Sequence, residues 1–293
     1  ALHNYHDQFK VFPYRQGGNA ATDVSSFYDV ASGLVHLLPQ MDQAPLFTQM
    51  MSQAATNPGL RPWDNNPIFR TDIPGLICPS DVLATNNSGR NNYRFCQGPW
   101  GKRNRYGVDV ASWGGERPIL GIFGAISRIG ISDVLDGTSN TIAMSERCQG
   151  QALIRNEVIG GVGIPATTWN DGYVDPKSPA STADLDTMER DCRATVVNGV
   201  YTNSKTNELP GDRFADGGNY FVGFSTLMTP NSPSCIGDNW DRNHMIISAT
   251  SRHTGIVHVL MADGAVKPAS SNIDKALWRG LGTRANNETI GDF

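Results

Sequence analysis

The feature that most constrains the fold is the segment SRHTGIVHVLMADGAVK, residues 251–267, which has the pattern of a β-hairpin. Residues 256–262 are mostly apolar and include three β-branched residues, and Asp263-Gly264 follows them directly. Asp-Gly is a favoured two-residue turn of type I′, because both central residues of that turn need positive φ. We therefore expect a terminal hairpin in which residues 265–267 return beside the first strand.

His253 and Asp263 raise the question of a shared site, because nine residues separate them. Ten residues of extended strand span about 33 Å. A catalytic pair or a metal site needs both side chains close to one ligand. The spacing therefore favours a structural interpretation. Asp263 supplies the turn, and His253 hydrogen-bonds locally where the strand begins.

The composition indicates a chain of turns and short strands. It has 31 Gly and 17 Pro in 293 residues, and a formal net charge of −4 with no basic stretch. Nothing in this balance favours nucleic acid or an anionic membrane surface as a partner. No apolar run approaches the roughly 20 residues that span a bilayer.

Helical periodicity is clearest at the two ends of the chain. Leu2, Tyr5 and Phe9 share one helix face, which we expect to contact the core. Pro268 should end the hairpin pairing, and Ser271 to Asp274 resemble a capping box before a short helix. Further expected elements are helices over 44–52, 133–136 and 182–190, and a strand over 141–146.

Three groups of polar residues could carry chemistry. The loop 237–244 offers oxygen ligands for calcium at Asp238, Asn239, Asp241 and Asn243. The same composition is also ordinary turn chemistry, and both interpretations stay open. His3, His6 and Asp7 lie at helical spacing for a metal, although exposed helix ends often carry histidine. The acidic segment 181–191 could hold a carboxylate pair for glycoside hydrolysis, but it also suits a solvated helix face.

Five cysteines are widely spaced, and none forms a Cys-x-x-Cys pair. An exported protein would favour disulfides. We predict a bond between Cys78 and Cys96, because their interval is short and both lie beside turn residues. A bond between Cys192 and Cys235 is a second prediction, and one cysteine is then left over.

Several segments, taken together and in order, carry a family resemblance. They are ALHNYHDQFKVFP (1–13), LLPQMDQAPLF (37–47), ICPSD (77–81), NNYRFCQG (91–98), ISDVLDGTSNTIAMSE (131–146), the hairpin segment and IDKALWRGLGTR (273–284). The chain resembles a large bacterial prepilin-like family of unknown function that ends in a His-x9-Asp-Gly motif. The motif falls on His253, Asp263 and Gly264. Any one block alone would be unspecific.

The resemblance implies an α+β fold of the type IV pilin-like kind, an N-terminal helix packed on an antiparallel β-sheet with loop-rich insertions. Residues 1–12 would be the end of that helix, and we expect its upstream part to be absent here. Residues 13–293 would form one globular head with an insertion at about 150–245. In such proteins the helix anchors the precursor in the membrane and then forms the filament core.

The expected function is that of a structural subunit of an extracellular filament, pseudopilus or surface assembly, with no enzymatic activity. Its partners would be further copies of itself, and calcium is the only candidate cofactor. The alternative is a secreted binding module, for example for polysaccharide, using loop residues such as Trp100 and Trp113.

Overall fold

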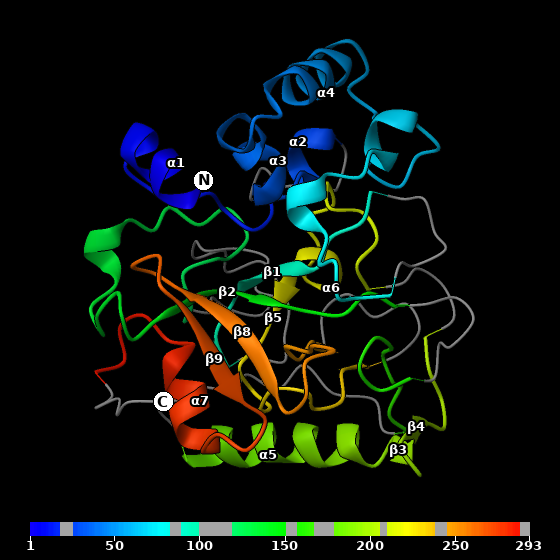
Figure 1. Ribbon diagram of the computed structural model, residues 1–293, viewed down its shortest axis with the longest axis vertical. Coiled ribbons are helices and arrows are strands. Elements are labelled where there is room, and N and C mark those ends of the chain that lie inside the picture. The colour runs from blue at the N-terminus through cyan, green and yellow to red at the C-terminus, as the bar shows by residue number, and fades with distance from the viewer. Residues whose placement is uncertain are drawn as a thin grey trace.

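The computed structural model describes residues 1–17, 26–82, 89–99, 119–150, 157–166, 179–205, 210–237 and 245–287. Its helices are α1 (Leu2–Phe9), α2 (Phe27–Val30), α3 (Gly33–Leu37), α4 (Ala44–Thr56), α5 (Pro179–Arg193), α6 (Asn219–Val222) and α7 (Lys275–Leu281). Its strands are β1 (Tyr93–Cys96), β2 (Ile142–Glu146), β3 (Val196–Val197), β4 (Val200–Tyr201), β5 (Gly223–Phe224), β6 (Cys235–Ile236), β7 (Met245–Ile246), β8 (Ile256–Met261) and β9 (Val266–Ser270). Figure 1 shows an α+β arrangement, with α1 to α4 on one side of a central sheet and α5 and α7 on the other.

The central sheet has five strands in the order β5-β1-β2-β8-β9. The pairs β1–β2, β2–β8 and β8–β9 are antiparallel, whereas β1 and β5 run parallel. The sheet is therefore mixed, which corrects the expectation of a purely antiparallel one. β5 follows α6 directly and runs in the same direction as β1.

The predicted terminal hairpin is present as β8 and β9, but its turn differs from the expected one. Buried and more exposed residues alternate along β8, as they do in a strand with one face on the core. Of the turn residues only Gly264 has positive φ, at 94°. The Met261 amide donates to the Ala265 carbonyl at 2.8 Å, so three residues form the loop. The turn is thus the three-residue kind with glycine in the left-handed position, and type I′ was wrong.

Pro268 does not end the pairing, because it lies inside β9 opposite His258. Proline lacks an amide hydrogen and is tolerated in an edge strand. β9 is the last strand of the sheet, so the missing amide hydrogen of Pro268 removes no hydrogen bond between strands. The prediction failed because the sequence alone did not show that this strand lies at an edge.

The helix face predicted for α1 is only partly in the core. Leu2 is buried and Tyr5 packs partly buried against the core, but Phe9 is 50% exposed. Lys10 adopts a left-handed conformation that ends α1 and redirects the chain. Phe12 is buried instead, with its ring 6.0 Å from that of Phe123. The expected contact through Phe9 is therefore wrong.

One described contact between α1 and the sheet lies at the hairpin turn. His3 Nε2 donates to the Ala262 carbonyl at 2.9 Å. A Cβ atom on Gly264 would come within 3.1 Å of the His3 ring, so this glycine is needed for its φ and for the close approach.

The remaining helices shift relative to the predicted bounds. α4 is longer than expected, and a 3-10 turn at Ile131–Asp133 replaces the predicted helix at 133–136. Asp274 caps α7 by accepting from the Leu277 amide at 2.9 Å, so the capping residue is not Ser271. Trp278 and Leu281 of α7 are both fully buried, and the Trp278 Nε1 donates to the Met228 carbonyl at 2.8 Å.

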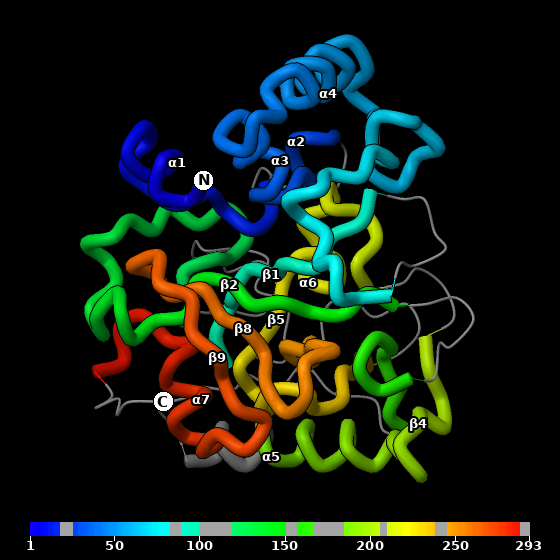
Figure 2. Tube along the Cα trace, viewed as in Figure 1, coloured from blue at the N-terminus to red at the C-terminus, as the bar shows by residue number. Residues whose placement is uncertain are grey.

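The described parts of 150–245 contribute to the core. They supply β5, α6 and buried aromatic residues such as Phe214. They also supply α5, and Figure 2 shows it beside α7, although the contacting residues are up to 93 positions apart. No helix within the described ranges is both long and apolar enough to cross a membrane.

Candidate functional site

Three potential ligand atoms converge at one end of the sheet. The Cys78 thiol, a Glu146 carboxylate oxygen and a His253 ring nitrogen all lie within 4.8 Å of one another. Cys78 follows the 3-10 turn Pro74–Leu76, Glu146 is the last residue of β2, and His253 precedes β8. We call these three residues the Cys-Glu-His cluster.

Asn92, directly before β1, holds the Cys78 segment in place. Its Oδ1 accepts from the Cys78 amide and from Gln149 Nε2, each at 2.9 Å. Its Nδ2 donates to Asp81 Oδ2 at 2.7 Å and to the Arg147 carbonyl at 3.1 Å. Asn92 is buried, so these bonds join the turn to β1 and to the end of β2 without competition from water.

Arg252 fixes the segment that carries His253. Its guanidinium pairs with both oxygens of Glu157 and donates to Asp81 Oδ1 at 3.2 Å. Hydrogen bonding to Glu157, and secondarily to Asp81, raises the Arg252 pKa. The neighbouring His253 amide donates to Ser251 Oγ at 3.1 Å. The ion-pair partners of Arg252 are therefore Asp81 and Glu157.

A hydrogen bond from β8 positions the Glu146 side chain. This side chain is 8% exposed, and Oε1 accepts from the His258 amide at 2.6 Å. The ring Nδ1 of His258 lies 3.3 Å from the same oxygen. The rings of His253 and His258 meet edge-on with centroids 5.3 Å apart. Burial raises the pKa of Tyr93, and the nearby Cys78 and Glu146 raise it further.

A small cavity of about 10 Å³ is lined by the three residues of the cluster together with neighbours that include Arg147 and Arg252. That is about the space needed for one water-sized particle. Cys148 lines the same cavity, and burial, followed by the charge of Asp81, raises its pKa to about 12. The Cys148 thiol therefore stays protonated at neutral pH.

The cluster can do two kinds of chemistry. Thiolate, imidazole and carboxylate are ligands of zinc and related metals. Cysteine beside histidine can also be a nucleophile with its base, which needs a hydrogen bond between them. Within the described contacts no hydrogen bond joins the Cys78 sulfur to His253, and the three ligand atoms converge on a common point. The geometry therefore suits a metal site better than a pair of nucleophile and base.

A second feature is an apolar pocket of about 440 Å³ between the start of α1 and the sheet. It is lined mainly by aliphatic and methionine side chains, among them Leu2, Leu37, Leu76, Met144 and Met261. Val266 lies on its rim and is 64% exposed. Glu146 and His258 also line this pocket, so it adjoins the Cys-Glu-His cluster.

The residues of the predicted motif do not share a site. His253 and Asp263 lie beyond opposite ends of β8, whose six residues span about 20 Å. Asp263 serves the turn by accepting from the Ala265 amide at 2.8 Å. The His253 backbone bonds locally as expected, but its ring belongs to the cluster. Sequence reasoning missed Cys78 and Glu146 as its partners, because no short spacing links the three positions.

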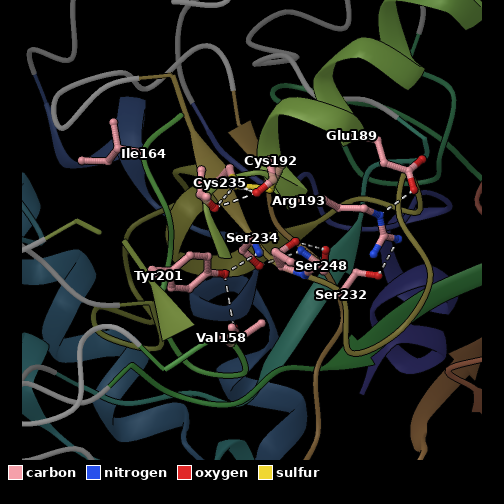
Figure 3. The surroundings of a disulfide bond; sticks show 12 residues. Val158, Ile164, Glu189, Cys192, Arg193, Tyr201, Ser232, Ser234, Cys235 and Ser248 are labelled. Carbon is pink, nitrogen blue, oxygen red and sulfur yellow. Dashed lines mark hydrogen bonds and ion pairs between the residues drawn. A yellow bond between two sulfur atoms is a disulfide. The ribbon is translucent and has the colours of Figure 1, made fainter. Parts of the chain in front are cut away.

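The two predicted disulfides differ in outcome. Cys192 of α5 and Cys235 of β6 are bonded, with Cα atoms 5.7 Å apart. Figure 3 shows this bond beside Tyr201, whose hydroxyl accepts from the Ser234 amide at 2.8 Å and donates to the Val158 carbonyl at 3.3 Å.

The predicted Cys78–Cys96 bond is wrong, because both residues are free thiols. Cys96 is the last residue of β1, buried near the Gly282 carbonyl, whereas Cys78 lies near Tyr93 at the first residue of β1. The strand separates them by about 10 Å. A short interval along the sequence therefore did not mean a short distance in space.

The other candidate residues form structural contacts or lie outside the described ranges. Asp238, Asn239, Asp241 and Asn243, predicted for calcium, are outside them, and so are Trp100 and Trp113. Asp186 and Glu189 of the acidic segment bond to Lys275 and Arg279 of α7. His6 Nε2 accepts a hydrogen bond from the Ile131 amide at 3.2 Å, whereas His3 Nε2 donates to the Ala262 carbonyl. The two histidines therefore bond to different parts of the backbone.

Comparison with known proteins places the chain in a family. The model of a family described as "Protein of unknown function (DUF1559)" matches residues 1–276. The chain belongs to the DUF1559 family. No curated protein and no solved structure shows a significant match to this DUF1559 chain. The family description assigns no activity.

Proposed function

We propose that this DUF1559 protein is a non-enzymatic structural subunit of an extracellular pilus-like filament, pseudopilus or surface assembly. The observation that carries the proposal is the apolar pocket between α1 and the sheet. A contiguous apolar groove, unlike single exposed apolar residues, is a common feature of interaction sites. The sequence blocks that resemble prepilin-like proteins point to the same kind of assembly.

The pocket suits a helix of a second copy of this chain. Its lining is apolar, and its volume of about 440 Å³ accommodates a few large side chains. Phe9 on the exposed side of α1 and Val266 on the pocket rim are large apolar residues open to solvent. Because each is already partly buried, covering its exposed part against a neighbouring copy would contribute about 1–2 kcal/mol. Self-association through this surface would therefore cover the apolar residues that the single chain exposes.

The disulfide supports an extracellular location. Such bonds form and persist in oxidising compartments and are rare in the cytosol. The bond between Cys192 and Cys235 lies in a buried cluster with Leu185, Met188 and Leu227. An exported subunit would keep this bond throughout its life.

The matched variants Val266→Arg and Val200→Arg test the proposal. Val266 lines the pocket, whereas Val200, also exposed, belongs to β4, far from α1 in Figure 1. We expect Val266→Arg to abolish the assembly in native surface fractions, because it brings a charge into an apolar contact. Val200→Arg should leave the assembly intact. Thermal unfolding would verify that both variants fold. Normal assembly of folded Val266→Arg would contradict the role of the pocket.

A further inference from the structure

We propose that Cys78, Glu146 and His253 bind a single zinc ion, with water as the fourth ligand. The three ligand atoms come from separate segments and lie within 4.8 Å of one another. This inference is independent of the proposed assembly function. It concerns residues that the sequence patterns did not connect.

The ligand chemistry selects the metal. A thiolate, an imidazole and a carboxylate form a mixed set that suits zinc, whereas calcium and magnesium prefer oxygen ligands alone. Three protein ligands leave one tetrahedral position for water. With the thiol deprotonated, zinc would balance the two negative charges of Cys78 and Glu146.

The distances require only a small adjustment. Ligand atoms about 2.0–2.3 Å from zinc lie roughly 3.5 Å from one another in a tetrahedral site. Atoms within 4.8 Å of one another can close around an ion if each moves by less than about 1 Å. The cavity of about 10 Å³ that Cys78, Glu146 and His253 line has room for one such particle.

The surroundings orient two of the three ligands. Glu146 Oε1 accepts from the His258 amide at 2.6 Å, which directs the carboxylate. Asn92 Oδ1 accepts a hydrogen bond from the Cys78 backbone amide at 2.9 Å. Hydrogen bonds from residues around the ligands orient those ligands in metal sites, and their loss typically weakens metal binding about 10–100-fold.

The arginines that line the cavity have other hydrogen-bond partners. Arg252 is paired with Asp81 and Glu157, and Arg147 donates to the Cys148 and Gly161 carbonyls and to Ser234 Oγ. His258 contacts Glu146 at 3.3 Å, but its side chain is 43% exposed, which weakens the pair through solvent screening.

Zinc binding to the whole chain tests the inference. EDTA-treated protein would be titrated with Zn²⁺ and its metal content measured. We expect one zinc per chain for the wild type. Cys78→Ala and Glu146→Gln should weaken binding at least about 100-fold, because direct ligands matter more than the hydrogen bonds around them. Cys148→Ala is the matched control, because it removes a thiol that lines the same cavity but is not a proposed ligand. It should bind zinc like the wild type.

Two measurements on the wild type keep the test independent of how the variants fold. Cobalt substitution should give a sulfur-to-metal charge-transfer absorption. Zinc should also protect Cys78 from alkylation, as peptide mapping would show. Absence of zinc binding by the wild type, or alkylation of Cys78 at the same rate with and without zinc, would overturn the inference. A zinc-independent fast reaction at Cys78 would instead identify a nucleophile.

Discussion

Buried titratable side chains determine how single residues respond to pH. Tyr14 and His36 are in contact, with ring centroids 4.9 Å apart and edge-on. Burial, followed by the influence of Tyr5, raises the Tyr14 pKa, so its hydroxyl keeps its proton and donates to the Nε2 of neutral His36. Burial lowers the His36 pKa to about 4. The folded protein therefore holds this imidazole neutral where an unfolded chain would protonate it.

Acid should destabilise the protein through His36. As pH falls below about 6.5, the unfolded state binds a proton that the folded state resists until about pH 4, so the free energy of unfolding decreases. The loss is on the order of 3 kcal/mol across this window. Urea unfolding at several pH values should show this slope in the wild type and a smaller slope in His36→Gln. Tyr14→Phe should keep the slope, because burial is its cause. An unchanged slope in His36→Gln would disprove the assignment.

The cluster shows where sequence reasoning stops at the residue scale. The separation of His253 from Asp263 followed from strand geometry, and the structure agrees. Convergence of Cys78 and Glu146 on His253 depends on how β2, β8 and the turn after Leu76 pack together. No local spacing encodes such a contact between segments. The turn type at Gly264 was missed for a related reason, since loop length depends on the register of both strands.

At the scale of elements, strong local patterns predicted the structure best. α1, α4, α5, α7 and the β8–β9 hairpin all occur near their predicted positions. Errors occurred where tertiary contacts decide, as with the parallel β5 and the exposed Phe9. β5 has only two residues and no recognisable pattern of its own.

The Cys192–Cys235 bond should contribute substantially to stability by joining α5 to β6. It closes an interval of 43 residues, for which loop entropy predicts about 4 kcal/mol. The double variant Cys192→Ala/Cys235→Ala should lose about this much in chemical unfolding. The wild type under reducing conditions should show a similar loss. Non-reducing peptide mapping should recover Cys78, Cys96 and Cys148 as thiols, and a bond between Cys78 and Cys96 would contradict the structure.

At the scale of the whole molecule, the two features of interest adjoin one another. Glu146 belongs to the Cys-Glu-His cluster and also lines the apolar pocket beside α1. A zinc ion at the cluster would fix the end of β2 next to the proposed contact surface. The sequence predicted the α+β class and the N-terminal helix, but a pocket between distant segments exists only in the folded chain.

Imaging of native material tests the central claim, that this protein is an assembly subunit, most directly. Surface fractions from cells that produce the natural protein would be viewed by negative-stain electron microscopy with antibodies against this chain. We predict that the antibodies label filaments or other regular multimers. The Val266→Arg protein should give no labelled multimers. If the natural, processed wild-type protein gives only single, monomer-sized particles, the proposed function is wrong.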